Sequence, residues 1–159
     1  RQDQPPDEWG AVPSSENSTW DAAVCNFEAN GYRLPTAAEW EWAARGGKNY
    51  TYAGSDDYNE VAWCSENTGD TGTRDVKTKK ANGYGLYDMS GNVYEWCWDW
   101  YGNVTSATPP AGPSSGSKRC DRGGAWGFST DVEEVAYRDY DSPNFSGYTN
   151  GFRVVRSAN

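Results

Sequence analysis

The chain has 159 residues, of which 14 are basic and 23 acidic, and its net charge of −9 argues against a nucleic-acid backbone or an anionic membrane as partner. It contains no histidine, which excludes the Ser-His-Asp and Cys-His catalytic groups and every zinc site that uses histidine. No apolar run is long enough to span a membrane, so we expect one domain that does not insert into a bilayer.

Aromatic residues dominate the apolar part of the composition. Hydrophobic residues make up only 36% of the chain, yet aromatic residues reach 15%, with nine tryptophans and eleven tyrosines. Eighteen glycines indicate many turns and few long helices. The core is therefore expected to contain a few large rings rather than packed aliphatic side chains.

The N-terminal segment, residues 1–19, contains prolines and shows no periodicity, so we expect it to be irregular. A first helix is predicted from residue 18 or 19 to Ala29, because Asn30 and Gly31 form a stop signal. The domain itself is expected to occupy residues 20–159.

The best-marked helix follows in the stretch GYRLPTAAEWEWAARGG, residues 31–47. Thr36 and Glu39 have the spacing of a capping box, in which each side chain accepts a hydrogen bond from the backbone N–H of the other residue. This spacing predicts a helix over Ala37–Arg45, with Gly46 as the C′ residue that ends it.

Residues 48–81 are polar and loop-like apart from a short predicted strand at 61–64. The next stretch, GYGLYDMSGNVYEWCWDWY at residues 83–101, joins a turn rich in glycine and oxygen-bearing side chains to tryptophans at every second position. Trp96, Trp98 and Trp100 share one side of this period-two pattern. The pattern predicts a strand whose tryptophan face is buried in the core.

The C-terminal third alternates loops with short strands. Residues 101–118 are rich in Pro, Gly and Ser and are predicted to form a surface loop. Two strand-like stretches, 122–126 and 151–156, enclose a long segment of weak regular pattern. Two early helices, a small mixed sheet and long loops together predict the α+β class.

The four cysteines, Cys25, Cys64, Cys97 and Cys120, show no C-x-x-C spacing, which argues against a zinc ribbon or a thioredoxin-type site. Four cysteines allow three disulfide pairings, and the sequence does not distinguish them. Two disulfides in an exported protein and buried free thiols both remain open.

Three blocks of the sequence resemble the formylglycine-generating-enzyme-like domain, also called the sulfatase-modifying-factor domain. The blocks are residues 31–47, residues 83–101, and the pair RGGAW and GFRVV at 122–126 and 151–155. They occur in the order and spacing of the family. The resemblance implies a C-type lectin-like fold, a mixed α+β scaffold that displays long loops. Family members usually carry strands before the first helix, so we expect segment 1–19 to be what remains of a longer chain.

The chain departs from the enzymes of this family at the two cysteines that bind copper. Phe128 and Glu133 occupy those positions, and neither a phenyl ring nor a lone carboxylate replaces a thiolate as a ligand of Cu(I). We therefore expect no enzyme activity and no catalytic residue. A formylglycine-generating-type oxidase, or an inactive homologue of it, is the alternative. Glu133 and Glu134 are expected to form a solvated edge or to pair with Arg138.

The blocks RGGAW and GFRVVRS also resemble the flanks of the variable segment in variable proteins of diversity-generating retroelements, whose loops are rewritten at adenines. This resemblance implies a variable region over about residues 122–156. Adenine-directed changes in AAC codons cannot produce Lys, Glu, Gln, Met or Trp, and none of these occurs in residues 127–132 or 139–149. The resemblance also implies export, as a lipoprotein on the bacterial cell surface or outer membrane.

The loops between the last two predicted strands carry large apolar side chains without a strand or helix period. Phe128, Val132, Tyr140, Phe145 and Tyr148 lie among Asp, Ser, Gly and Asn, the composition of antibody binding loops. We interpret these residues as ligand contacts; packing of several of them onto their own loops is the alternative. The predicted binding residues are Trp126, Gly127, Phe128, Ser129, Asp131, Val132, Asp139, Tyr140, Ser142, Phe145, Tyr148 and Thr149.

Asp88, Gly91, Val93 and Glu95 fall where the resemblance to the family's enzymes places a calcium site. Two carboxylates and two backbone carbonyls in a glycine-containing turn suit a hard cation with six or more oxygen ligands. The alternative is a turn locked by hydrogen bonds, in which Asp88 and Asn92 bind backbone amides and Glu95 pairs with an arginine. No other cofactor is expected.

Together these features predict a binding module rather than an enzyme. A rigid lectin-like scaffold presents residues 127–132 and 139–149 as one receptor surface for a protein or another ligand on a host or cell surface. We expect the module to be a monomer without nucleic-acid partners. A structural surface domain with no ligand of its own is a plainer alternative.

Overall fold

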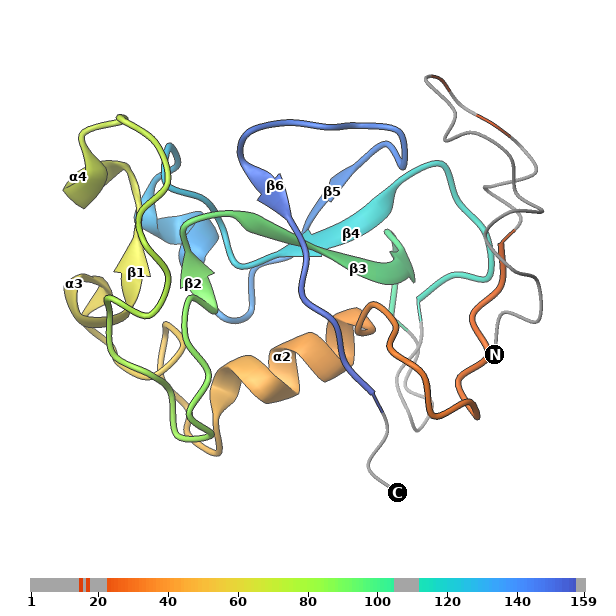
Figure 1. Cartoon of the computed structure of the whole chain (residues 1–159), viewed down its shortest axis with the longest axis horizontal. Coiled ribbons are helices and arrows are strands. Elements are labelled where there is room, and N and C mark those ends of the chain that lie inside the picture. The colour runs from red at the N-terminus through yellow and green to blue at the C-terminus, as the bar shows by residue number, and fades with distance from the viewer. Residues whose placement is uncertain (1–14, 16, 18–22, 105–111, 157–159) are drawn as a thin grey trace.

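The computed structural model describes residues 15, 17, 23–104 and 112–156 of the chain, and a four-stranded sheet lies at its centre (Figure 1). The elements are α2 Ala37–Arg45, α3 Tyr58–Val61, β1 Ala62–Trp63, α4 Ser65–Thr68, β2 Ser90–Gly91, β3 Tyr94–Trp100, β4 Arg119–Arg122, the 3₁₀ helix η2 Thr130–Glu133, β5 Asp139–Asp141 and β6 Asn150–Gly151. The sheet order is β5-β4-β3-β6, with β6 parallel to β3 and the other pairs antiparallel. Strands β1 and β2 form a separate parallel pair.

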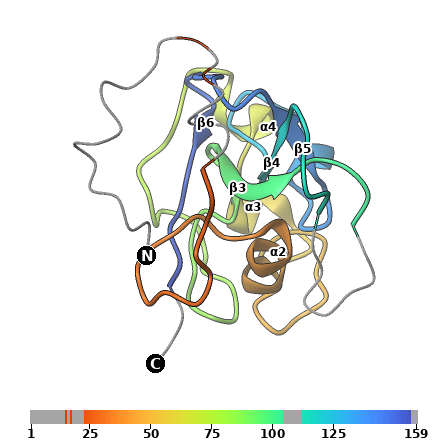
Figure 2. The ribbon, with the colours of Figure 1, turned by 90° about the vertical axis from the view of Figure 1, so that its right-hand side faces the viewer.

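Helix α2 covers one face of this sheet, beneath β3 and β4, and the core lies between them (Figure 2). Trp40 of α2 is 1% exposed and belongs to a cluster with Met89, Cys97, Cys120 and Val135. The expectation of a core made of several large rings is therefore wrong, because small and medium side chains fill most of this cluster. The few helices and the small mixed sheet confirm the α+β class.

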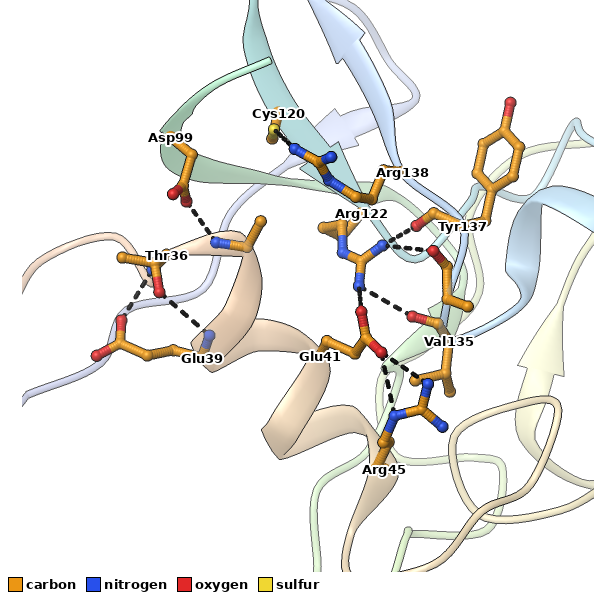
Figure 3. Close-up of polar contacts among 12 residues, drawn as sticks. Thr36, Glu39, Glu41, Arg45, Asp99, Cys120, Arg122, Val135, Tyr137 and Arg138 are labelled. Carbon is orange, nitrogen blue, oxygen red and sulfur yellow. Dashed lines mark hydrogen bonds and ion pairs between the residues drawn. The ribbon is translucent and has the colours of Figure 1, made fainter. Parts of the chain in front are cut away.

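The predicted capping box and its helix are confirmed. The Thr36 hydroxyl accepts a hydrogen bond from the Glu39 N–H at 3.1 Å, and the Glu39 carboxylate accepts one from the Thr36 N–H at 2.8 Å (Figure 3). Arg33 also binds Glu39 through two nitrogens, which fixes the chain that enters the helix. At the other end, Gly46 adopts the left-handed conformation, with φ of 57°, that a helix stop requires.

The first predicted helix is wrong over Ala23–Ala29, which form turns and irregular backbone, while residues 18–22 lie outside the described residues. The Asn26 side chain accepts a hydrogen bond from the Glu28 N–H at 3.1 Å. Such local side-chain bonds compete with helical hydrogen bonds. Val24 is exposed as well, so it does not dock this segment onto the core.

The prediction about the two faces of β3 is wrong. Cys97 is buried against α2, whereas Trp96, Trp98 and Trp100 are only half-buried on the other face. The Arg119 guanidinium lies 3.6 Å from the ring centre of Trp100 and 4.9 Å from that of Trp98. The tryptophans thus cover the outer face of the sheet together with a cation, and the core uses the smaller residues of the opposite parity.

The other predicted strands are shorter than expected or displaced. β1 is part of the predicted strand at 61–64. β4 ends where the predicted strand 122–126 begins, because Gly123 and Gly124 have φ of 96° and 72° and turn the chain out of the sheet. Only Gly151 of the stretch 151–156 lies in β6, and Val155 forms an isolated bridge with Arg33.

All four cysteines are free thiols, so the structure contains the second of the two alternatives left open by the sequence. Cys64, Cys97 and Cys120 are buried and Cys25 is half-buried. Within the described ranges, no helix combines the length and apolar character that crossing a membrane requires.

Candidate receptor surface

The two loop segments predicted to bind ligand are attached to the scaffold through their backbones. The Trp126 N–H donates to the Asn92 carbonyl at 3.0 Å, and the Phe128 carbonyl accepts from the Ser65 N–H at 2.9 Å. In the second segment, the Thr149 carbonyl accepts from the Tyr94 N–H at 2.8 Å. Since these bonds use main-chain atoms, they are available whichever side chains the loops carry.

Three predicted aromatic residues lie in exposed or half-exposed positions near one another. Tyr148 is 82% exposed, and its ring centre lies 5.9 Å from that of Trp126. Phe128, 42% exposed, meets the ring of buried Tyr94 edge-on at 5.4 Å. These rings combine open contact area with a fixed position, which is the property that aromatic residues bring to binding surfaces.

Tyr140 does not join these rings. Strand pairing places it opposite Cys120, whose thiol accepts a hydrogen bond from Arg138 on the α2 side of the sheet. The ring of Tyr140 lies 4.4 Å from that of Tyr101. Phe145 is exposed but folds over its own loop, because a Cβ atom at Gly147 would lie 2.9 Å from its ring. The structure therefore divides the predicted set between two faces.

The small residues of the predicted set complete the two loops. Gly127 is exposed, and apart from its two chain neighbours no described residue has an atom within 4 Å of the position of a Cβ atom there, so larger residues fit. The remaining members are exposed Ser129, which donates to exposed Asp131, and half-buried Val132, Asp139, Ser142 and Thr149. Among them, Ser142 accepts a hydrogen bond from the Lys118 ammonium at 2.8 Å.

A cluster of aspartates beside these loops was not predicted. The register of β4 and β5 places Asp121 opposite Asp139, and Asp141 lies on the same side because alternate residues share a face. Asp121 is buried and accepts one hydrogen bond, from Asn150. Burial, followed by the charges of Asp139 and Asp141, raises the pKa of Asp121 to about 7. The sequence contains the alternating pattern Asp139-Tyr140-Asp141, but it gives no sign that Asp121 lies beside these aspartates, because that depends on the pairing of β4 with β5.

Glu133 is fully buried, so the expectation of a solvated edge or a pair with Arg138 is wrong. Its carboxyl group lies between two glycines, since a Cβ atom at Gly91 or Gly124 would come within 2.8 or 2.5 Å of it. Neither carboxyl oxygen has a hydrogen-bond partner among the described residues. Burial, with a smaller effect of the Glu66 charge, raises the pKa of Glu133 to about 10. The group is therefore neutral at pH 7. Its neighbour Glu134 is exposed.

The turn predicted to bind calcium shows the contacts of the alternative interpretation. Arg153 donates to both oxygens of Glu95 at 2.6 Å, and the Trp40 indole N–H donates to one of them at 2.7 Å. The Asp88 carboxylate accepts from the Lys77 N–H, and the Asn92 side chain accepts from the Arg74 N–H.

In this arrangement the oxygen atoms expected to bind calcium do not fit the ion, because Arg153 donates hydrogen bonds to both carboxylate oxygens of Glu95. The Gly91 carbonyl accepts a hydrogen bond from the Val93 N–H within the turn. Across the described ranges, no group of three or more His, Cys, Asp or Glu residues is placed to share a metal ion. Calcium at Asp88, Gly91, Val93 and Glu95 stays a prediction, and it requires Glu95 to exchange its arginine for the ion.

The free thiols are poor nucleophiles in this fold. Burial raises the pKa of Cys64 to about 12 and raises that of Cys97 and Cys120, in spite of the nearby arginines. The pKa of half-buried Cys25 is also raised. Because the thiolate is the reactive form and the form that binds metals, none of the four positions favours thiol chemistry.

Comparison with known proteins identifies the family to which this chain is similar. Residues 7–158 match the Sulfatase-modifying factor enzyme 1-like domain. The structure is similar to that of Treponema denticola variable protein 1, with a TM-score of 0.84 and 40% identity, covering 96% of this chain and 56% of that one. The resemblance deduced from the three sequence blocks is confirmed.

Two curated relatives show the range of proteins that carry this domain. The chain is 41% identical to Chaperone protein LppX of Paenibacillus barcinonensis, over 90% of this chain and 55% of the relative. It is 35% identical to the Formylglycine-generating enzyme of Streptomyces coelicolor, over 88% of this chain and 51% of the enzyme. The chain thus spans about half the length of the curated relatives it matches.

Proposed function

Because the chain belongs to the Sulfatase-modifying factor enzyme 1-like domain family, we propose that it uses this fold as a ligand-binding receptor domain whose loops are diversified. The loops around Trp126–Val132 and Asp139–Thr149 supply the binding surface, with Trp126, Phe128 and Tyr148 as its aromatic contacts. The likeness to the treponemal variable protein supports this function, since it extends over 96% of the chain.

The observation that carries the proposal is that main-chain bonds hold both loops, separately from most loop side chains. The exceptions are Ser142, which accepts from Lys118, and Trp126, whose indole N–H donates to the Tyr148 carbonyl. Asn92, Ser65 and Tyr94 bind the loops through main-chain atoms, while the Tyr148 ring is 82% exposed. A receptor that is rewritten repeatedly needs this separation, because a loop side chain that also stabilised the fold could not be changed without loss of stability.

The oxidase alternative is favoured by the identity to the Formylglycine-generating enzyme and opposed by the residues at the copper positions. Phe128 is a hydrocarbon ring at the surface, and Glu133 is a neutral, enclosed carboxyl group. Neither offers the soft thiolate that Cu(I) requires. Uptake of Cu(I) by the native protein, with its thiols reduced, would favour the oxidase over the receptor.

We further propose that the ligand is a protein or another molecule outside the cell and that the domain acts as a monomer. Display on the bacterial surface as part of a lipoprotein belongs to the same proposal, and the likeness to the treponemal variable protein supports it. At the level of the gene, diversification requires a template repeat with adenines at the codons for residues 127–149, beside a gene for reverse transcriptase.

Replacing Phe128, Tyr140 and Tyr148 together by alanine is expected to change the melting temperature by no more than a few degrees. Each residue keeps more than 40% of its surface in water, so each substitution loses less apolar burial than one in the core. Calorimetry of the triple variant measures this, with Trp40→Ala as the control that should cost about 3–5 kcal/mol. A loss of about 3 kcal/mol for each loop aromatic would show that these residues belong to the core.

Binding itself can be tested with two display libraries of this domain. The first randomises residues 127–132 and 139–149; the control randomises the same number of positions within 83–101. We expect most clones of the first library to fold and to yield binders to a biotinylated test protein, because the loop backbones are held by the scaffold. If the loop library loses folded clones as often as the control, the receptor proposal is wrong.

A further inference from the structure

A cavity lies on the α2 side of the molecule, away from the exposed rings of Trp126, Phe128 and Tyr148. Its volume is about 380 Å³, and none of the twelve predicted binding residues is among the described residues that line it. Ala38, Trp42 and Val104 supply much of its apolar wall. Cavities of this size with mostly apolar walls and a few polar groups are typical of sites for small molecules.

The two carboxylates of this cavity already have partners. Glu41 accepts hydrogen bonds from Arg45 and from Arg122, each at 2.6 Å (Figure 3). Asp99 accepts a hydrogen bond from the Ala37 N–H at the first turn of α2, where the helix dipole favours a negative charge. Neither carboxylate therefore needs a cation from a ligand.

Arg122 is also used almost completely by the protein. A guanidinium group has five N–H donors, four of them on the two terminal nitrogens. These nitrogens bind Glu41 and the carbonyls of Val135, Ala136 and Tyr137. Arg122 contributes positive charge to the wall of the cavity, but all its terminal donors are occupied.

Arg138 differs from the other two arginines of this cavity. Its terminal nitrogens donate to the Gly102 carbonyl at 3.0 Å and to the Cys120 thiol at 3.2 Å, both of which are uncharged acceptors. No carboxylate among the described residues lies in salt-bridge range of Arg138, and its Nε has no partner there. Two of five donors are thus used, and this half-buried guanidinium lies over the Tyr101 ring at 5.3 Å but has no carboxylate partner among the described residues.

We propose that this cavity binds a small organic carboxylate with an apolar body. The carboxylate pairs with the Arg138 guanidinium, whose planar fork suits two oxygens. The apolar body lies against Ala38, Val104 and the ring of Trp42. Trp42 lines the cavity, is 66% exposed, and its ring centre lies 4.9 Å from that of Tyr84 in a tilted contact, so the ring is held in place yet remains accessible.

Benzoate is a suitable probe, because it joins a carboxylate to an apolar ring of a size that the cavity admits. Titration of the whole domain, followed by the NMR signals of the Ala38 amide and the Trp42 indole, should give saturable shifts. Benzamide has the same shape without the charge and should bind at least about tenfold more weakly. Equal binding of benzamide and benzoate, or no saturable shift with benzoate, would overturn the proposal.

The matched variants are Arg138→Gln and Arg45→Gln, which remove the same charge from the same cavity. Arg138→Gln should weaken benzoate binding about tenfold or more, whereas Arg45→Gln should change it less than about threefold, because Glu41 and Asn49 already occupy Arg45. Equal losses in the two variants would rule out Arg138 as the carboxylate partner. If a variant unfolds, the comparison of benzoate with benzamide on the unaltered protein still shows whether the cavity prefers a carboxylate. Phe128→Ala with Tyr148→Ala should leave benzoate binding unchanged, which separates this site from the receptor surface.

Discussion

Replacing Arg122 by alanine is expected to lower the free energy of unfolding by about 3–5 kcal/mol. Arg122 is 0% exposed and joins α2 to the chain after η2, through Glu41 and the carbonyls of Val135, Ala136 and Tyr137 (Figure 3). Truncation leaves Glu41 with Arg45 alone and removes the donor from the three carbonyls, of which that of Val135 is buried and therefore costly to leave unpaired. It also opens a cavity beside the Trp40 ring.

Arg45→Ala is the matched control for this prediction. Arg45 binds the same carboxylate at the same distance of 2.6 Å, but both partners are about one-third exposed. A salt bridge of this kind contributes only about 0–1 kcal/mol. Urea unfolding of the two variants measures the difference, and similar losses would mean that the buried network of Arg122 is not what holds α2 to the sheet.

The stability of the protein is expected to fall as the pH rises above neutrality, because of Glu133. Its pKa is about 10 in the folded protein and near the ordinary 4.5 in the unfolded chain. The folded state therefore holds a proton that the unfolded state releases. The contribution is fully present below about pH 4.5 and is lost as the pH rises toward 10, at about 1.4 kcal/mol per pH unit.

The range from about pH 7 to about pH 8.5 isolates this effect, with an expected loss of about 2 kcal/mol. Asp121 acts with the same sign, but its raised pKa of about 7 confines its effect to lower pH. Glu133→Gln should abolish the fall of the free energy of unfolding over this pH range, because an amide does not titrate. Glu134→Gln, at the exposed neighbouring position, should leave that fall unchanged. Parallel stability curves for the wild type and Glu133→Gln would contradict the assignment.

The local signals in the sequence predicted local structure well. The capping box of Thr36 and Glu39, the stop at Gly46 and the strand after the polar turn all depend on neighbours within a few residues. The helix expected to end at Ala29 failed for an equally local reason, since Asn26 binds the Glu28 N–H. That bond is a weak signal in the sequence, because asparagine also occurs inside helices.

The side of a strand that faces the core was not a local property. Tryptophans at alternate positions indicated a buried face, but α2 packs on the side of Cys97 and leaves Trp98 and Trp100 to enclose Arg119. In the same way, two adjacent glutamates suggested a solvated edge. Glu133 is buried because Gly91 and Gly124, distant in the sequence, leave room for its carboxyl group. Both outcomes depend on contacts that no short pattern contains.

The exposure of Phe128, Phe145 and Tyr148 was predictable, because large rings in polar loops without periodicity have no regular element to bury them. Tyr140 is also exposed, although it lies in the short strand β5. The grouping of these rings was not predictable. The register of β4 and β5 decides that Tyr140 faces Cys120 and Tyr101, away from Tyr148. The set of binding residues predicted from the sequence therefore includes residues that lie on two different faces of the molecule.

The main-chain bonds from Asn92, Ser65 and Tyr94 to the two loops have a consequence for affinity. A loop that is already ordered before its ligand arrives has little conformational entropy left to lose on association. Under the proposed receptor function, a side chain introduced into these loops therefore loses little of its contact energy to ordering of the backbone. Few substitutions are then needed to make the surface selective for a new ligand.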